Sequence, residues 1–247
     1  MPSHATFKLW RTHPDGDGTF QTFHTEITEG MVVLDVVHKI QAEQAPDLAV
    51  RWNCKAGKCG SCSAEINGKP RLMCMTRLSQ VNLHEPVTVE PMRAFPPIKD
   101  LVTDVSWNFR VKKTIAKFKP RPREADGTYR MPQTDVDRVQ EFRKCIECFL
   151  CQDVCHVLRD HHKHDEFIGP RFLVYTANLE MNPLDTEDRV PDLKDKHNIG
   201  YCNIGKCCTK VCPEHIHITD NAIIPLKERV VDRFYDPISR LLRMVTG

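Results

Sequence analysis

Long apolar runs are absent from this sequence. One of the longest, Met31 to Leu34, is far shorter than the roughly 20 residues that a membrane-spanning helix needs. The N-terminus alternates polar and apolar residues, so we expect neither a secretory nor a transit signal. The 35 basic and 33 acidic side chains give a net charge of only +2, which leaves no broad basic field for nucleic acid. Only 11 glycines are present, which argues against a linker-rich protein.

Cysteine, by contrast, is abundant. Twelve cysteines in 247 residues are about 5%, below the roughly 8–10% of a short disulfide scaffold. Because we expect no export signal, the expected compartment is reducing, and disulfides are rare there. Twelve thiols in such a compartment favour metal ligands over bridges. The chain length suits one large domain or two of ordinary size.

The first 97 residues carry strand signals around a single helical segment. We expect strands and turns with these bounds: Thr6–Arg11, the turn Asp15–Gly18, Phe20–Phe23, Ser63–Ile66 with the tight turn Asn67-Gly68, and Val87–Glu90. Between them, Met31–Glu43 has the apolar spacing of a helix. A small domain of sheet plus helix is therefore predicted over residues 1–97.

Composition changes at Phe95-Pro96-Pro97, and the rest of the chain is predicted to be helical. We expect an amphipathic helix over Ile98–Phe118, a loop to Pro132, helices from Asp135 onward, and a basic amphipathic tail over Pro225–Val245 that is broken at Pro237. The fold class predicted is thus α+β, with an all-α domain over residues 98–247.

The first cysteine group is Cys54, Cys59, Cys62 and Cys74. The spacing C-x4-C-x2-C with a distant fourth cysteine is the plant-type [2Fe–2S] pattern. Gly57 and Gly60 permit the positive φ values and close approach that wrapping a small inorganic core requires. Four thiolates also suit Zn²⁺, so a zinc site is the alternative, although zinc knuckles usually pair two C-x2-C arms.

The second and third groups form an internal repeat. Cys145, Cys148, Cys151 and Cys155 have the spacing C-x2-C-x2-C-x3-C of bacterial ferredoxins, in which the fourth cysteine serves the other cluster. Laid over this run, the third group aligns Cys202 with Cys145, Cys208 with Cys151, and Cys212 with Cys155. At the position of Cys148 the third group has Gly205.

The crossing rule then assigns the ligands. Cys145, Cys148, Cys151 and Cys212 give four ligands for a [4Fe–4S] cluster. Cys155, Cys202 and Cys208 give three ligands, which makes [3Fe–4S] the economical interpretation. We predict no separate mononuclear metal site. Cys207 is left over, either as a free thiol or as a fourth ligand that would complete a second [4Fe–4S] cluster.

This arrangement resembles the iron–sulfur subunit of succinate dehydrogenase and fumarate reductase over nearly the whole chain. The resemblance rests on four motifs: Cys54-Lys55-Ala56-Gly57-Lys58-Cys59-Gly60-Ser61-Cys62, Cys145-Ile146-Glu147-Cys148 with Cys151 and Cys155, Phe167-Ile168-Gly169-Pro170, and Cys208 to Cys212 with Pro213. It implies a β-grasp ferredoxin domain followed by an α-helical ferredoxin domain.

The resemblance also implies a function within respiratory complex II. Electrons would pass from the FAD of a dicarboxylate-oxidising subunit through [2Fe–2S], [4Fe–4S] and [3Fe–4S] to quinone at a membrane anchor. The subunit would lie at the cytoplasmic face of the cell membrane. The dicarboxylate site is expected on the partner chain, because this sequence has no general-base constellation, no catalytic residues of its own and no G-x-G-x-x-G fingerprint. Succinate oxidation is the direction favoured by prior frequency, with fumarate reduction as the alternative.

Two positions depart from the pattern of many ubiquinone-using members. Asp160 stands where they carry Trp, and Asn203 stands where they carry His. A quinone site is therefore not transferred residue by residue, and menaquinone is the expected acceptor. The run His156, His161, His162 and His164 is interpreted as a solvated helix end, with a proton relay as the alternative. The basic tail is interpreted either as a solvated face or as a contact for partner or lipid.

Two further alternatives stay open. One is a related two-domain iron–sulfur subunit that serves another flavoenzyme or a quinone-linked reductase. The other, of a different class, is a zinc-stabilised interaction protein without redox chemistry.

Overall fold

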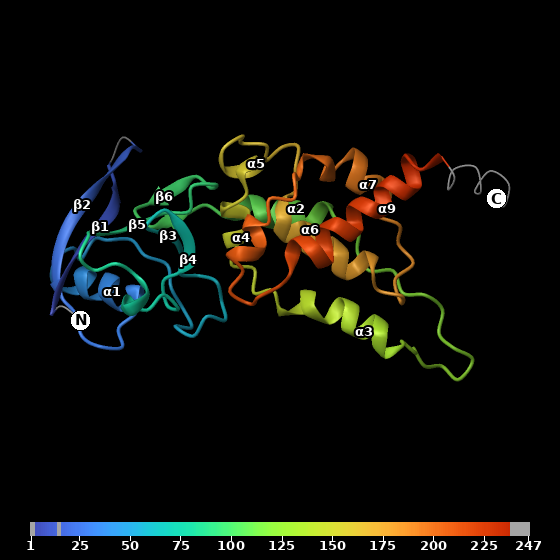
Figure 1. The fold of residues 1–247 in the computed structure, drawn as a ribbon, viewed down its shortest axis with the longest axis horizontal. Coiled ribbons are helices and arrows are strands. Elements are labelled where there is room, and N and C mark those ends of the chain that lie inside the picture. Colours follow the sequence, from blue (N-terminus) through green and yellow to red (C-terminus); the bar gives the residue numbers. More distant parts are fainter. Residues whose placement is uncertain (1–2, 14–15, 238–247) are drawn as a thin grey trace. The chain divides into compact units, whose positions relative to one another are not determined.

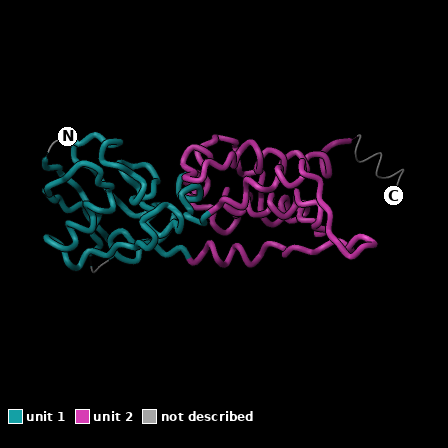
Figure 2. Tube along the Cα trace, turned by 90° about the horizontal axis from the view of Figure 1, so that it is seen from below, with its two compact units in different colours: residues 1–105, 146–154 teal, residues 106–145, 155–247 magenta. Residues whose placement is uncertain are grey.

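The computed structural model describes residues 3–13 and 16–237, which form two compact units (Figure 2). The first unit contains residues up to 105 together with 146–154, and the second contains 106–145 and the residues from 155 on. The segment Ile146–Val154, which carries Cys148 and Cys151, therefore packs within the same unit as the sheet.

The first unit is built on a five-stranded mixed sheet in the order β2-β1-β5-β3-β4 (Figure 1). Its elements are β1 His4–Thr12, β2 Gly18–Glu26, α1 Val33–Glu43, β3 Ser63–Ile66, β4 Lys69–Leu72, a 3-10 turn Leu78–Gln80, β5 Val87–Glu90, β6 Pro97–Lys99, β7 Val102–Thr103 and α4 Leu150–Asp153. Strands β1 and β5 are parallel, whereas the other neighbours are antiparallel. The strands and the helix predicted for this region are confirmed.

Helix α1 supplies the apolar face that the sheet needs. Val33, Val36, Val37 and Ile40 recur at helical spacing and are fully buried. The inward residues of the sheet, such as Phe7, are buried as well. Asp35 accepts a hydrogen bond from the Val32 N–H and so begins the helix.

The predicted turn at Asn67-Gly68 joins β3 to β4. Both residues have positive φ, 49° and 68°, as a tight two-residue hairpin turn requires. The prediction from this dipeptide is confirmed.

The helix predicted over Ile98–Phe118 is wrong at both ends, because α2 spans only Ser106–Thr114. Residues 97–103 instead form the short β6–β7 hairpin. Asp100 lies at its turn with φ of 48°, and its carboxylate accepts hydrogen bonds from the backbone of Thr12 and Ala49. Because these bonds fix a buried carboxylate in place, they override the helical spacing of the apolar residues.

The second unit is mainly helical, as predicted (Figure 1). Its elements are α2 Ser106–Thr114, α3 Gln133–Gln140, a 3-10 turn Glu141–Lys144, α5 His156–Arg159, α6 Gly169–Glu180, α7 Val190–Asp195, a 3-10 turn Ile199–Tyr201, α8 Cys207–Lys210, the π-helix Ile218–Ile223 and α9 Ile224–Phe234. Helix α6 forms the centre of the core, with nine of its residues buried.

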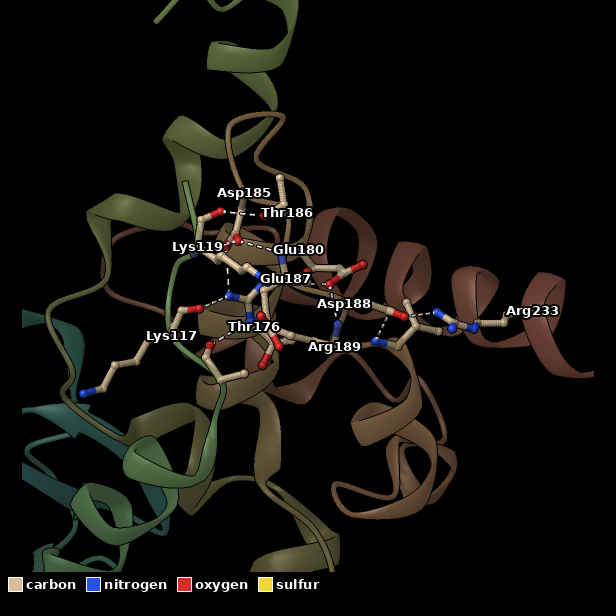
Figure 3. Close-up of polar contacts among 12 residues, drawn as sticks. Lys117, Lys119, Thr176, Glu180, Asp185, Thr186, Glu187, Asp188, Arg189 and Arg233 are labelled. Carbon is tan, nitrogen blue, oxygen red and sulfur yellow. Dashed lines mark hydrogen bonds and ion pairs between the residues drawn. The ribbon is translucent and has the colours of Figure 1, made fainter. Parts of the chain in front are cut away.

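Arg189, just before α7, ties an extended segment of this unit to the helices (Figure 3). Its guanidinium donates to the carbonyls of Ala116 and Lys117 at 2.8 Å each and pairs with Asp185 at 2.8 Å. Arg189 and Asp185 side chains are each 1% exposed. A buried arginine with this many partners fixes the chain path, because losing any partner would leave a charge uncompensated.

Within the predicted basic tail, helix α9 ends at Phe234. The last part of that predicted tail, residues 238–245, lies outside the described residues. In the part of the chain that the structure describes, none of the helices combines the length and apolar character that crossing a bilayer demands.

Candidate metal centres

All twelve cysteines lie in the described residues, and none of them forms a disulfide. Among the described residues, no three His, Cys, Asp or Glu side chains are arranged to hold a single metal ion.

The Cys54–Cys62 loop folds around its own sulfurs. Lys55, Gly57 and Gly60 adopt positive φ of 54°, 67° and 71°. As a result, backbone N–H groups turn inward, and those of Ala56 and Lys58 lie 3.4 and 3.3 Å from the Sγ of Cys54. Such inward amides stabilise thiolates, which is the environment that an anionic iron–sulfur core needs.

Cys59 and Cys62 continue the same pattern deeper in the unit. The Ser61 N–H lies 3.5 Å from Cys59 Sγ, and the Cys74 N–H lies 3.5 Å from Cys62 Sγ. Burial alone would raise the pKa of Cys59, but hydrogen bonds from Ser61 and Cys54 outweigh it and lower that pKa to about 7. Burial raises the pKa of Cys62 to about 12. The thiols of Cys74 and Cys59 also raise this pKa, whereas the hydrogen bond from the Cys74 N–H lowers it.

These interactions link the four predicted [2Fe–2S] ligands into one group. Cys59 interacts with Cys54, and Cys62 interacts with both Cys59 and Cys74. The sequence-predicted set Cys54, Cys59, Cys62 and Cys74 is thus brought together at one end of β3 and β4. The four thiols with inward amides fit a [2Fe–2S] core.

The same loop touches the Cys148 segment. A Cβ atom on Gly60 would lie 2.5 Å from the Cα of Cys148, so only glycine fits there. The Ser63 hydroxyl, which is buried, lies within hydrogen-bonding distance of the carbonyls of both Gly60 and Cys148, at 2.8 and 2.9 Å. The backbone of Cys148 is therefore in direct contact with the loop of the first cysteine group.

The two later cysteine runs share a backbone conformation. Glu147 and Phe149 have φ of 54° and 62°, and the corresponding residues Ile204 and Lys206 have φ of 61° and 58°. Left-handed conformations are uncommon for such residues, so the match extends the internal repeat from spacing to local geometry. Gly205 lies between two of them, at the position that Cys148 occupies in the first copy.

Cys155 is grouped with the third run rather than with its own. Burial raises the pKa of Cys155 to about 11, and the charges of Cys208 and Cys202 push it in the same direction. The pKa of Cys208 is raised by burial too, with a contribution from Cys202. These three thiols are the set predicted for a [3Fe–4S] cluster. Their mutual proximity fits a shared cluster, and Cys208 is the buried member while Cys155 and Cys202 are half-buried.

Cys212 is grouped in turn with the second run. Burial raises its pKa, and Cys145 adds to the effect. Both residues belong to the second unit, whereas Cys148 and Cys151 are buried in the first.

Cys207 is exposed, unlike its neighbour Cys208. Its thiol donates to the Gly205 carbonyl over 3.5 Å. The thiols whose charges raise the pKa of Cys155 are Cys208 and Cys202. Cys207 is therefore not grouped with Cys155, Cys202 and Cys208.

The histidine run lies beside α5. The rings of His156 and His161 are 6.0 Å apart, and the carbonyl of His164 accepts a hydrogen bond from the Trp107 indole at 3.1 Å.

Sequence reasoning missed two groups that approach the third run. Thr219, in the π-helix, places its hydroxyl 3.6 Å from the Sγ of Cys208. Lys227, in α9, donates to the carbonyl of Cys202 at 2.6 Å. Both lie at least eleven residues from the cysteine that they contact, so spacing around the cysteines carries no signal for either.

Comparison with known proteins gives two family matches. Residues 6–110 match a 2Fe-2S iron-sulfur cluster binding domain, and residues 141–216 match a 4Fe-4S dicluster domain. The fumarate reductase iron-sulfur subunit of Mycobacterium tuberculosis is 33% identical over 215 residues, covering 84% of each chain. A mitochondrial succinate dehydrogenase [ubiquinone] iron-sulfur subunit of Oryza sativa is 29% identical and covers 86% of this chain and 77% of the relative.

A solved structure is also similar. A chain of the Mycobacterium smegmatis Sdh1 complex in the apo form superimposes with a TM-score of 0.92 at 58% identity. The match covers 96% of this chain and 100% of that chain.

Proposed function

Because the chain belongs to the family of succinate dehydrogenase and fumarate reductase iron–sulfur subunits, we propose that it carries electrons through three clusters between a flavin subunit and membrane quinone. When bound, such clusters accept and release single electrons. The chain's own contribution is to hold them, to exclude water and to set their potentials.

The observation that carries the proposal is the exchange of cysteines between the two later runs. Cys155 lies among Cys202 and Cys208, whereas Cys212 lies beside Cys145. This supports [4Fe–4S] ligation by Cys145, Cys148, Cys151 and Cys212, and [3Fe–4S] ligation by Cys155, Cys202 and Cys208.

The three-iron assignment is supported by Gly205. The backbone on both sides of it has the conformation found around Cys148, yet glycine offers no ligand atom. The exposed thiol of Cys207 points to a carbonyl. We therefore propose that Cys207 is a free thiol.

The first cluster has the most accessible ligand. Cys54 is exposed, whereas Cys62 and Cys74 are buried. A partly exposed [2Fe–2S] site suits electron entry from an FAD-containing partner. Contact between its loop and the backbone of Cys148 supports transfer onward to [4Fe–4S].

Partners and location follow from the family. We propose a flavoprotein subunit and a membrane anchor, peripheral attachment at the cytoplasmic face of the cell membrane, and menaquinone as acceptor. Asp160 and Asn203, in place of the Trp and His of many ubiquinone-using members, support menaquinone. The mycobacterial relative named as a fumarate reductase subunit keeps the reverse direction as the second candidate. Comparing turnover of the purified complex with menaquinone and ubiquinone analogues tests this, and a strong preference for ubiquinone contradicts it.

Anaerobic iron and acid-labile sulfide analysis with EPR tests the cluster assignment. We expect about nine irons and about ten sulfides per chain, an EPR signal from [3Fe–4S] in the oxidised state and a [2Fe–2S] signal on reduction. About ten irons per chain, with no EPR signal in the oxidised state, would show that Cys207 is a fourth ligand of the third cluster. Zinc in place of iron would support the interaction protein instead.

A further inference from the structure

Thr219 places a buried hydroxyl against one of the proposed [3Fe–4S] ligands. Its side-chain oxygen lies 3.6 Å from Cys208 Sγ, and the residues are 1% and 9% exposed. Water therefore has little access to this sulfur, and the hydroxyl is a polar partner that reaches it from outside the cysteine runs. A ligand sulfur in such a place depends on protein donors for its stabilisation.

Thr209 fixes the direction of this contact. The N–H of Thr219 donates to the Thr209 hydroxyl oxygen at 3.0 Å, so the Thr209 hydrogen is directed elsewhere. That hydrogen is donated to the Thr219 hydroxyl oxygen at 3.1 Å. With its oxygen accepting from Thr209, the Thr219 hydroxyl has its own hydrogen left for Cys208. A thiolate that ligates iron carries no proton, so Thr219 can only be the donor.

Hydrogen bonds around the start of its helix fix the position of Thr219. It lies in the π-helix Ile218–Ile223, and π-helical turns are rare and frequent at functional sites. The carboxylate of Glu141 accepts hydrogen bonds from the backbone N–H and the ring of His217 at 2.7 Å each, and from the Asn221 amide. The start of the π-helix is thereby tied down on both sides of Thr219.

Thr209 has no hydroxyl counterpart in the second run. In the internal repeat it corresponds to Gln152, whose side chain is an amide. The orienting hydroxyl is therefore found in the run that offers three ligands.

We propose that Thr219, oriented by Thr209, donates a hydrogen bond to the Cys208 thiolate and raises the reduction potential of the cluster held by Cys155, Cys202 and Cys208. This inference rests on the proposed function. Reduction adds one negative charge, part of which resides on the ligand sulfurs. A donor aimed at Cys208 stabilises the reduced form more than the oxidised form. Thr219 is thus a positioning residue that makes this cluster a better electron acceptor.

The test is a redox titration of the intact complex, followed by the EPR signal of the oxidised cluster. Thr219→Val removes the hydroxyl and keeps the shape. We expect about a tenfold fall in the ratio of reduced to oxidised cluster at a fixed potential, which is a midpoint lower by about 59 mV for one electron. Thr219→Ser keeps the donor and should titrate as the wild type does.

Thr176→Val is the matched control. Thr176 is also fully buried in the second unit, and its hydroxyl donates to the Phe172 carbonyl at 2.8 Å. Removing that hydroxyl should leave the midpoint unchanged. If Thr219→Val fails to assemble, Thr209→Val tests the same bond through its orientation and should lower the midpoint by a smaller amount.

The possible results distinguish a failure of the proposed function from a failure of the inference about Thr219. A wild-type complex without a three-iron signal would overturn the proposed function and this inference with it. A normal wild-type signal with the same midpoint in wild type, Thr219→Val and Thr209→Val would overturn the inference alone. An equal fall in Thr219→Val and Thr176→Val would show a general packing effect and would also overturn it.

Discussion

The first and third cysteine groups stabilise their sulfurs by different means. Around Cys54 the donors are the backbone N–H groups of Ala56 and Lys58, brought inward by Gly57 and by Lys55 in the left-handed region, and Cys59 is approached by both the N–H and the side chain of Ser61. Around Cys208 a side-chain donor, the hydroxyl of Thr219, approaches from a distant helix and acts beside the backbone of Thr209. Backbone donors are fixed by the chain path and stay in place when a side chain is replaced by any residue other than proline. The Thr219 hydroxyl can be removed by one substitution that keeps the backbone donors.

The largest effect on cluster content is expected in the Cys54–Cys62 loop, whose geometry is set by its backbone. Gly60→Ala would place Cβ 2.5 Å from the Cα of Cys148 at a φ of 71°. Because neither backbone can yield cheaply, we expect loss of the [2Fe–2S] cluster, measured as visible absorbance and iron content of the purified complex.

Gly68→Ala is the control for backbone strain alone. Gly68 has a similar φ of 68°, but nothing lies within 4 Å of its Cβ position. It should cost about 1 kcal/mol and keep the cluster. Equal damage by the two variants would show that close packing on Cys148 is unimportant.

Arg189→Met should produce the next largest effect, in the second unit. It leaves Asp185 buried without its cation and frees the carbonyls of Ala116 and Lys117. We expect a loss of about 3–5 kcal/mol in the free energy of unfolding, measured by urea denaturation with helical circular dichroism. Arg233→Met removes an exposed ion pair with Asp188 and should cost less than about 1 kcal/mol. Similar losses would contradict the role given to Arg189.

Gly205→Cys tests whether one missing ligand accounts for the difference between the second and third cysteine runs. A Cβ there would meet Asn203 at 3.4 Å and Cys207 Sγ at 3.9 Å, which are tolerable contacts. We expect the new thiol to restore the ligand that Cys148 supplies in the first copy. Iron would rise by about one per chain, and the oxidised EPR signal would disappear. Cys207→Ser is the companion variant and should change neither; loss of iron from it would make Cys207 a ligand.

The smallest effect is expected from Glu141→Gln and should depend on pH. Burial tends to raise the pKa of Glu141, but hydrogen bonds from His217 and Asn221 outweigh it and hold the pKa below the ordinary 4.5. A lowered carboxyl pKa contributes stability above about pH 4.5, and that contribution disappears as pH falls through the folded value. The variant should therefore be less stable than wild type near neutrality, by less than about 1 kcal/mol because the partners His217 and Asn221 are exposed, and the difference should vanish in acid. A difference that persists at pH 3 would contradict this.

The sequence alone predicts those features of the fold and of the site that depend on neighbouring residues. Cysteine spacing predicted three groups, and Asn67-Gly68 and the alternating strands predicted the hairpins, because each depends on neighbouring residues. The helix expected over Ile98–Phe118 was wrong because Asp100 is fixed by Thr12 and Ala49, which lie about 88 and 51 residues away. Thr219 was not predicted for the same reason. Only the fold brings its hydroxyl close to the Sγ of Cys208, eleven residues away along the chain.

The most direct test of the central claim is rapid-freeze EPR of the intact complex after anaerobic mixing with succinate. We predict that the three-iron signal of the oxidised complex is lost as electrons arrive and returns on addition of a menaquinone analogue. A three-iron signal that stays unchanged while the flavin partner is fully reduced would contradict electron transfer through Cys155, Cys202 and Cys208.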